Sequence, residues 1–151
     1  QRQMCIRDSI YIVAGIKGRW PKDGHIGYVL EYYRENSRYP AVIREVVPVQ
    51  QLNESRATLE ALILAIKRLT EKCILTVYTE SRYLYSGYEE KEYVKHWKEN
   101  GWMKADGHEV KNRDKWQELD QLLQGNLVRF LLHENNAYTK SLLVEIEEKE
   151  R

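Results

Sequence analysis

Hydrophobic residues in the first third of the chain fall into short runs separated by turn-forming residues. The runs are 10–16 (IYIVAGI), 25–33 (HIGYVLEYY) and 41–49 (AVIREVVPV), and they are rich in β-branched and aromatic side chains. Gly, Pro, Asn and Ser occupy the stretches between them, which is typical of strands joined by short turns. The pattern therefore predicts three consecutive strands that pair in an antiparallel manner.

The hydrophobic period then lengthens to that of a helix. In residues 56–69 (RATLEALILAIKRL) the larger apolar side chains recur three and four positions apart, on one face, and Asn53 or Ser55 is available as the N-cap. The following run, 73–79 (CILTVYT), is almost continuously apolar. Such a run is typical of a strand whose two faces are both buried in a parallel arrangement.

The second half of the chain is mainly helical. Residues 83–102 are rich in Lys and Trp, a polar loop follows at 103–112, and further helices are predicted at 113–123 and 140–151, on either side of a last strand at 127–133. The order of elements is therefore three strands, helix, strand, helices, strand, helix. This order predicts an α/β domain with a mixed five-stranded sheet and helices on both faces.

Length and composition indicate one globular domain without a membrane segment. The chain has 151 residues, a net charge of +1 and no apolar run near the roughly 18 residues of a membrane span. Cys5 and Cys73 form no metal-binding pair, so we expect reduced thiols in a cytoplasmic protein, with Cys73 in the core. Residues 1–9 (QRQMCIRDS) lack the pattern of a secretory signal. They are interpreted as a non-native or disordered leader, which leaves residues 10–151 as the domain.

Three stretches carry more specific patterns. Residues 97–119 (WKENGWMKADGHEVKNRDKWQEL) place three tryptophans around a basic loop, 79–87 (TESRYLYSG) follow the apolar strand, and 14–32 (AGIKGRWPKDGHIGYVLEY) span the first turn. Together they resemble the ribonuclease HI family, in which the first stretch is similar to the helix, basic loop and helix that grip the DNA strand of an RNA:DNA hybrid. The resemblance extends over residues 10–148 and implies a ribonuclease H-like fold.

The same resemblance implies a cleavage site with two divalent ions, Mg²⁺ or Mn²⁺, held by four carboxylates. In this chain the four positions fall on Ala14, Thr58, Glu80 and about Leu143, so Glu80 is the acid retained. Two dications about 4 Å apart repel each other by roughly 4 kcal/mol even at the dielectric constant of water, which one carboxylate cannot offset. Glu80 is therefore the candidate metal ligand, and a protein with no cofactor is the alternative.

Other acids near these positions are candidates for restoring the site. Glu60 lies two residues beyond Thr58, about 200° around the helix, so we expect it to point away from Glu80. Glu145 and Glu147 lie in the last helix and are better placed. A full two-metal site is nevertheless not expected.

Each candidate residue has a functional and a structural interpretation. Glu80 handles a metal or a proton, or it is a solvated acid that caps the next helix. His133 resembles a mobile histidine that helps product leave, or it is an ordinary loop residue. Arg56 contacts the RNA backbone, or it is an exposed arginine at a helix start. The tryptophans and lysines of 97–119 form a platform for bases and phosphates, or they anchor and solvate a protruding helix. The nucleic-acid-binding candidates are Lys17, Arg19, Arg56, Trp97, Lys98, Trp102, Lys104 and Lys111.

Three functions are compatible with these residues. The preferred hypothesis is a ribonuclease HI-like pseudoenzyme that binds RNA:DNA hybrid or duplex RNA and has lost most or all of its cleavage activity. The second is a metal-dependent RNA:DNA hybrid endoribonuclease with an atypical site around Glu80. The third is a scaffold domain that binds a protein partner, whose identity stays open. No membrane partner is expected under any of the three.

Overall fold

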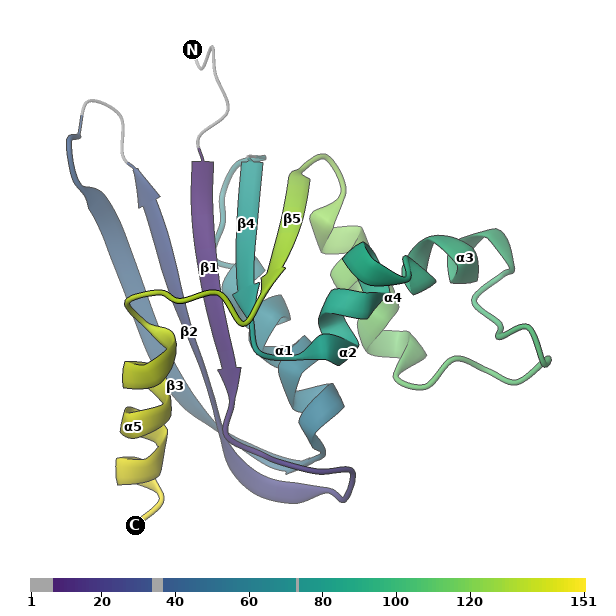
Figure 1. Cartoon of the computed structure of the whole chain (residues 1–151), viewed down its shortest axis with the longest axis horizontal. Helices are drawn as coiled ribbons and strands as arrows, with labels where there is room; N and C mark the ends of the chain where they lie inside the picture. Colours follow the sequence, from purple (N-terminus) through teal and green to yellow (C-terminus); the bar gives the residue numbers. More distant parts are fainter. Residues whose placement is uncertain (1–6, 34–36, 73) are drawn as a thin grey trace.

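Five strands form one mixed sheet, as the order of elements predicts. Figure 1 shows the computed structural model, in which residues 7–33, 37–72 and 74–151 are described. The strand order is β3-β2-β1-β4-β5, with β1–β2 and β2–β3 antiparallel and β1–β4 and β4–β5 parallel. The strands are β1 (Arg7–Ala14), β2 (Lys22–Tyr33), β3 (Pro40–Leu52), β4 (Ile74–Thr79) and β5 (Leu127–Leu132).

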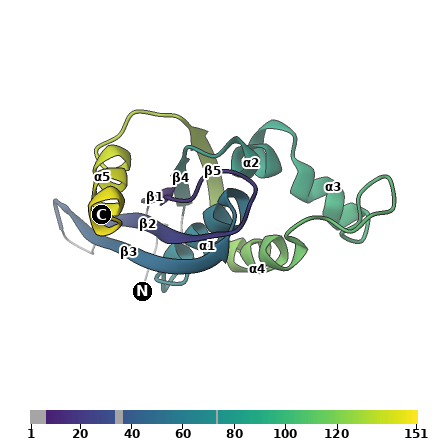
Figure 2. The same cartoon turned by 90° about the horizontal axis from the view of Figure 1, so that it is seen from below.

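Helices cover both faces of the sheet, which confirms the predicted architecture. Figure 2 shows α5 on one face and α1 on the other, while α3 and the loop after it extend sideways past α4. The helices are α1 (Glu54–Ile66), α2 (Arg82–Tyr85), the π-helical turn η1 (Ser86–Glu90), α3 (Tyr93–Glu99), α4 (Arg113–Leu123) and α5 (Thr139–Lys149). We call residues 93–112 the protrusion. None of the helices in the described part of the chain has the length and apolarity needed to cross a membrane.

Alternation along β1 separates two hydrophobic cores. Ile10 and Ile12 are buried together with the apolar face of α1, whereas Tyr11 and Val13 are buried against Leu142 of α5. Successive side chains of a strand point to opposite faces, so one strand supplies both cores. The central strand is thereby held in place from two sides, and its carboxyl end is a rigid support for the residues that follow it.

The start of α1 is set by a single cap. The side-chain oxygen of Asn53 accepts the backbone N–H of Arg56 at 2.9 Å, so Asn53 is the N-cap rather than Ser55. The side chains of Leu59 and Leu62 are then fully buried against the sheet. This packing brings the first turn of α1 beside the end of β1.

Two sequence predictions about the strands are corrected. In β4, Leu75 and Val77 are buried, but Thr76 and Tyr78 on the other face are only half-buried. The reason is that α5 packs against β1, β2 and β3 and leaves that face of β4 less covered. β1 begins at Arg7 rather than at Ile10, so residues 7–9 of the predicted leader lie in the sheet. The rest of the predicted leader, residues 1–6 with Cys5, lies outside the described residues. Cys73, which was predicted in the core, lies outside them as well.

Candidate nucleic-acid interface

A shallow cleft lies where β1 and β4 end beside the first turn of α1. Open sheets commonly place ligands at the carboxyl ends of their strands. The enclosed space is small, with a volume of about 20 Å³. Its lining residues are Ile12, Val13, Ala14, Lys17, Glu54, Thr58, Thr79, Glu80 and Ser81. This cleft contains three of the four positions at which the family resemblance implies carboxylates.

Glu80 is paired with His133 at this cleft. The Oε1 atom of Glu80 lies 3.0 Å from Nδ1 of His133, and both side chains are substantially exposed. The backbone N–H of His133 donates to the carbonyl of Thr79 at 3.1 Å, and His133 adopts a left-handed conformation with φ 57°. The cap of α2 is Ser81, whose hydroxyl accepts the N–H of Leu84, so the interpretation of Glu80 as a helix cap is wrong.

The other three positions offer no carboxylate. Ala14 ends β1, and Leu143 is a partly exposed residue of α5. Thr58 is buried, and its hydroxyl donates to the carbonyl of Glu54 at 2.9 Å. At the family positions in β1 and α1, the groups beside Glu80 are therefore a methyl group and a hydroxyl that is already hydrogen-bonded.

The displaced acids are held elsewhere. Glu60 accepts from Nζ of Lys115 at 2.7 Å and so points toward α4, in agreement with the prediction that it points away from Glu80. Glu145 accepts from Arg44 of β3 at 2.9 Å, and Glu147 is exposed. Within the described ranges, no three His, Cys, Asp or Glu side chains are grouped as metal ligands. Glu80 by itself does not fit a pair of divalent ions, because one exposed carboxylate cannot balance their repulsion.

A second carboxylate at the cleft, Glu54, is one that sequence reasoning missed. Its Oε1 accepts the backbone N–H of Gly18 at 2.9 Å, and its Oε2 lies 3.7 Å from Nζ of Lys17. An acid in the first turn of a helix is ordinarily explained by the helix dipole, so the sequence carried no signal of this contact. The bond joins the turn between β1 and β2 to α1.

The turn between β1 and β2, residues 15–21, carries the candidates Lys17 and Arg19. The Arg19 guanidinium lies 5.0 Å from the ring centroid of Trp20, and that indole is 68% exposed. The side chain of Asn53 donates to the carbonyl of Arg19 at 3.2 Å. Two cations and one exposed aromatic ring are thus presented beside the cleft on a turn that is bonded to α1.

Three of the four tryptophans, Trp97, Trp102 and Trp116, form one aromatic cluster that ties the protrusion to the fold. Trp116 is fully buried and donates from its indole N–H to the hydroxyl of Tyr83 at 2.9 Å. Trp97 meets Trp116 edge-on, with ring centroids 5.5 Å apart, and lies 6.4 Å from Trp102. Trp97 also stacks on Tyr93 at 5.7 Å. Trp116 is therefore an anchor, whereas Trp97 and Trp102 remain partly exposed.

A groove of about 910 Å³ runs along the protrusion. It is lined by Tyr83, Tyr93, His96, Trp97, Asn100, Met103, Lys104, Ala105, Val110 and Lys111. Two of the predicted cations, Lys104 and Lys111, therefore share a groove with Trp97. Lys98 does not line it, because its ammonium group pairs with Asp120 of α4 at 2.9 Å.

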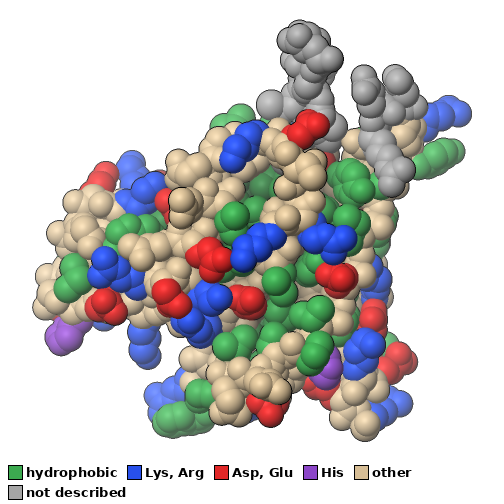
Figure 3. Space-filling model, turned by 180° about the vertical axis from the view of Figure 1, so that it is seen from behind, with side chains coloured by type: hydrophobic (Ala, Val, Ile, Leu, Met, Phe, Trp, Pro, Cys, Tyr) green, Lys and Arg blue, Asp and Glu red, His purple; other side chains and the backbone are tan. Residues whose placement is uncertain are grey.

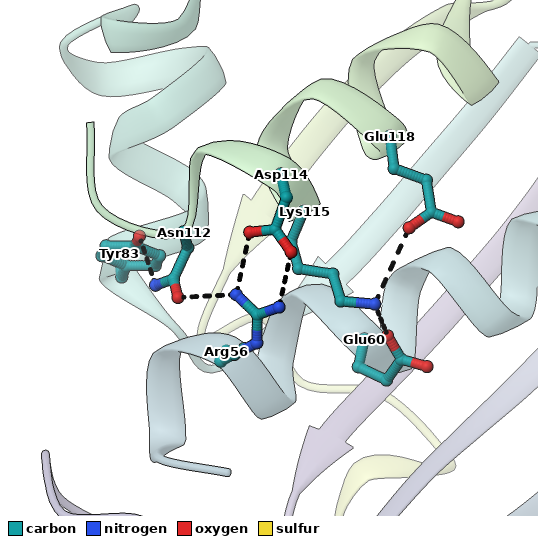
Figure 4. A network of polar contacts seen from close by, with 7 residues as sticks. All are labelled: Arg56, Glu60, Tyr83, Asn112, Asp114, Lys115 and Glu118. Atoms are coloured by element: carbon teal, nitrogen blue, oxygen red, sulfur yellow. Dashed lines mark hydrogen bonds and ion pairs between the residues drawn. The ribbon is translucent and has the colours of Figure 1, made fainter. Parts of the chain in front are cut away.

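Arg56 is committed to a polar network between α1 and α4, which Figure 4 shows. Its guanidinium donates to both carboxylate oxygens of Asp114, at 3.0 and 2.6 Å, and to the side-chain oxygen of Asn112 at 3.2 Å. The Arg56 hydrogen bonds lower the pKa of Asp114 to about 2. Lys115 extends the network to Glu60. Arg56 thus joins two helices, and its contact with nucleic acid stays a prediction.

Charges of both signs are mixed on the surface. Figure 3 shows Lys and Arg side chains interspersed with Asp and Glu over the face behind the view of Figure 1. This distribution agrees with the net charge of +1. Long-range attraction of a polyanion is consequently weak, and binding of nucleic acid depends on local cations such as those of the groove and the β1–β2 turn.

Comparisons with known proteins agree on one family. The RNase H family model matches residues 7–132. A ribonuclease H of Acetivibrio thermocellus is 33% identical over 133 residues, covering 86% of this chain and 85% of that protein. A ribonuclease H of Francisella tularensis subsp. novicida is 41% identical over 85 residues, 56% of this chain and 55% of that protein.

Solved structures show the same fold. LC9-RNase H1, described as a type 1 RNase H with the type 2 active-site motif, superimposes with a TM-score of 0.70 at 20% identity, covering 99% of this chain and 72% of that one. LC11-RNase H1, solved in complex with RNA/DNA hybrid, gives a TM-score of 0.56 at 16% identity, covering 97% and 99%. The matched family model and the relative from Acetivibrio thermocellus together establish that this chain belongs to the ribonuclease H family.

Proposed function

We propose that this protein binds RNA:DNA hybrid, or a related duplex such as duplex RNA, and cleaves it very weakly or not at all. The observation that carries the proposal is the composition of the cleft. Glu80 is paired with His133, while Ala14 and Thr58 supply no carboxylate beside it. A divalent ion bound by Glu80 alone is held weakly. The other carboxylate that lines the cleft, Glu54, is already bonded to Gly18 and Lys17, so a second ion would lack a free ligand to offset the repulsion.

The groove of the protrusion supports the binding part of the proposal. Lys104 and Lys111 supply positive charge for phosphates, and Trp97 and Tyr93 supply aromatic surface for sugars and bases. LC11-RNase H1, which shares the fold, was solved with an RNA/DNA hybrid, so hybrid is the first ligand to test. In this proposal, the protrusion holds one strand and the β1–β2 turn contacts the other.

A second candidate is an active hybrid endoribonuclease with an atypical site around Glu80. The observation that favours it is the pairing of a carboxylate and an imidazole at the end of a central strand, together with relatives named ribonuclease H. Such a pair is able to bind an ion or move a proton at the cleft. Magnesium or manganese is the ion that the family implies.

Cleavage of a labelled RNA:DNA hybrid in Mg²⁺ and in Mn²⁺ separates the two candidates. The intact protein and Glu80→Gln are purified in parallel, with Glu145→Gln as a charge-matched variant on α5. We expect no cleavage by any of the three. Cleavage lost only in Glu80→Gln establishes the second candidate, whereas equal cleavage by all three indicates a contaminating host nuclease.

Hybrid affinity measured by fluorescence anisotropy over a range of salt concentrations tests the binding surface. We expect Lys104→Ala to weaken binding and to reduce the slope of log K against log salt by about 0.9, one phosphate contact. Trp102→Ala is expected to weaken binding through loss of aromatic surface. Lys140→Ala on α5 is the matched control. Equal affinity in all four proteins contradicts the protrusion as the binding surface, whereas no affinity of the intact protein for hybrid favours the scaffold hypothesis.

A further inference from the structure

Two donors in the β1–β2 turn converge on one carboxylate of the same chain. The backbone N–H of Gly18 donates to Oε1 of Glu54 at 2.9 Å, and the ammonium group of Lys17 lies 3.7 Å from Oε2. Gly18 has a φ of 87°, a conformation that a glycine adopts without strain, and a Cβ there would meet nothing within 4 Å. The turn thus presents an N–H group and a cation together, and the group that they hold is an anion.

We propose that Lys17 and Gly18 form a phosphate-binding site that Glu54 occupies in the free protein and that a phosphodiester of the bound nucleic acid takes over. The inference rests on the proposed function, because it concerns how nucleic-acid binding at the same surface is regulated. Carboxylate and phosphate oxygens accept the same charge-assisted hydrogen bonds. The exchange needs no divalent cation, because the ammonium group of Lys17 supplies the positive charge at the cleft.

The contacts of Glu54 allow its carboxylate to leave. The Lys17 and Glu54 side chains are 68% and 42% exposed, and ion pairs between exposed side chains contribute little to stability. The N-cap of α1 is Asn53, so the helix start does not depend on the Glu54 side chain. The backbone N–H of Glu54 donates to the carbonyl of Gly18 at 3.0 Å, and this bond keeps the turn in place without the carboxylate.

The charges in the cleft explain why the exchange regulates binding. Lys17, Glu54 and Glu80 line the same small space. With the Glu54 carboxylate in place, a phosphate meets two acids, and the cation is already paired. When that carboxylate turns outward, the cleft loses one negative charge next to the phosphate and gains two free donors. Glu54 therefore acts as an internal competitor of the nucleic-acid backbone.

Hybrid affinity in EDTA, measured by fluorescence anisotropy on the full chain, tests this proposal. We expect Glu54→Gln to bind about five-fold more tightly than the intact protein, the magnitude of one exposed ion pair. The gain should disappear in the double variant with Lys17→Gln. Glu145→Gln, which removes an acid from an ion pair on α5, is the control and should not change the affinity. The inference is overturned if Glu145→Gln gains as much hybrid affinity as Glu54→Gln, or if the gain in affinity persists in the double variant with Lys17→Gln.

A second measurement separates this inference from the proposed function. The amide resonance of Gly18 is followed by NMR in ¹⁵N-labelled Glu54→Gln during titration with inorganic phosphate. A phosphate-induced shift of the Gly18 amide that is larger in Glu54→Gln than in the intact protein supports the phosphate site. If none of the variants binds hybrid, this result means that only the proposed ligand is wrong. No shift of the Gly18 amide in Glu54→Gln overturns the phosphate site, whatever the hybrid affinity.

Discussion

Replacing Gly87 by alanine tests how tightly the protrusion is anchored. Gly87 lies in η1 against the buried ring of Trp116, and a Cβ at this position would be 2.5 Å from Cη2 and 2.8 Å from Cζ3 of that ring. The ring cannot easily move away, because its N–H is bonded to Tyr83 at 2.9 Å and Trp97 packs against it edge-on. Either η1 or α4 must shift to admit the methyl group.

Two opposing effects set the change in the free energy of unfolding that we expect for Gly87→Ala. Overpacking a close-packed site costs about 1–3 kcal/mol, and contact with two ring carbons below 3.0 Å places this site near the upper end. Alanine in a helical segment recovers up to about 1 kcal/mol relative to glycine. The net expectation for Gly87→Ala is a loss of about 2 kcal/mol in the free energy of unfolding, equivalent to a fall of roughly 6 °C in Tm.

Unfolding in guanidinium chloride, followed by tryptophan fluorescence, measures this loss. Trp116→Phe supplies the matched background, since the smaller ring lacks the carbons that the methyl group would strike. Gly87→Ala should therefore be neutral or stabilising in the Trp116→Phe protein. The reasoning is refuted when Gly87→Ala stabilises the intact protein, or when it costs the same in both backgrounds.

Three further predictions concern the α1–α4 network, the sheet edge and the cleft. The folded pKa of Asp114 is about 2 against an ordinary value of 3.8, so the stability from its bond to Arg56 is complete above about pH 4 and lost as the pH falls toward 2. Asp114→Asn should therefore lose less stability than the intact protein across that interval in acid-dependent thermal unfolding, and equal losses contradict the pairing. Glu89→Ala removes the carboxylate that accepts the backbone N–H of Phe130, in the edge strand β5, at 2.6 Å. The free energy of unfolding measured in urea should fall by about 1 kcal/mol. An unchanged midpoint of urea unfolding contradicts this role of Glu89. The double variant Ala14→Asp, Thr58→Glu restores two carboxylates at the cleft. Saturating MgCl₂ should therefore raise its Tm by several degrees more than that of the intact protein. An equal rise in Tm of both proteins counts against the cleft as the site of lost metal ligands.

The network around Arg56 and the tryptophan cluster explain how a long protrusion stays in position. The bidentate bond to Asp114 fixes the start of α4 on α1, and buried Trp116 packs the first turn of α4 against η1. The partly exposed Trp97 then extends this support into α3. Residues that the sequence suggested for nucleic-acid binding thus divide into supports, such as Arg56, and residues that line the groove, such as Lys104.

The sequence by itself determined the order and type of the elements. The short alternating runs, the helical period from residue 56 and the last acidic helix specify local structure, because a strand or a helix buries one face according to its own period. The direction of Glu60 also follows from spacing along one helix, and the sequence narrows the cap of that helix to Asn53 or Ser55. The retained Glu80 was visible for the same reason, as the acid after an apolar strand.

Only the tertiary structure decided which side chains meet. Glu54 reaches Gly18 across 36 residues, Glu80 reaches His133 across 53, and the sequence contains no local sign of either contact. Burial of Trp116 and the partial exposure of one face of β4 likewise depend on where α4 and α5 pack. Periodicity states which face of an element is apolar, whereas the partner of a polar side chain is set by the packing of whole elements on the sheet. For that reason Lys17 was identified from the sequence as a candidate, but Glu54, the carboxylate that pairs with it in the cleft, was not.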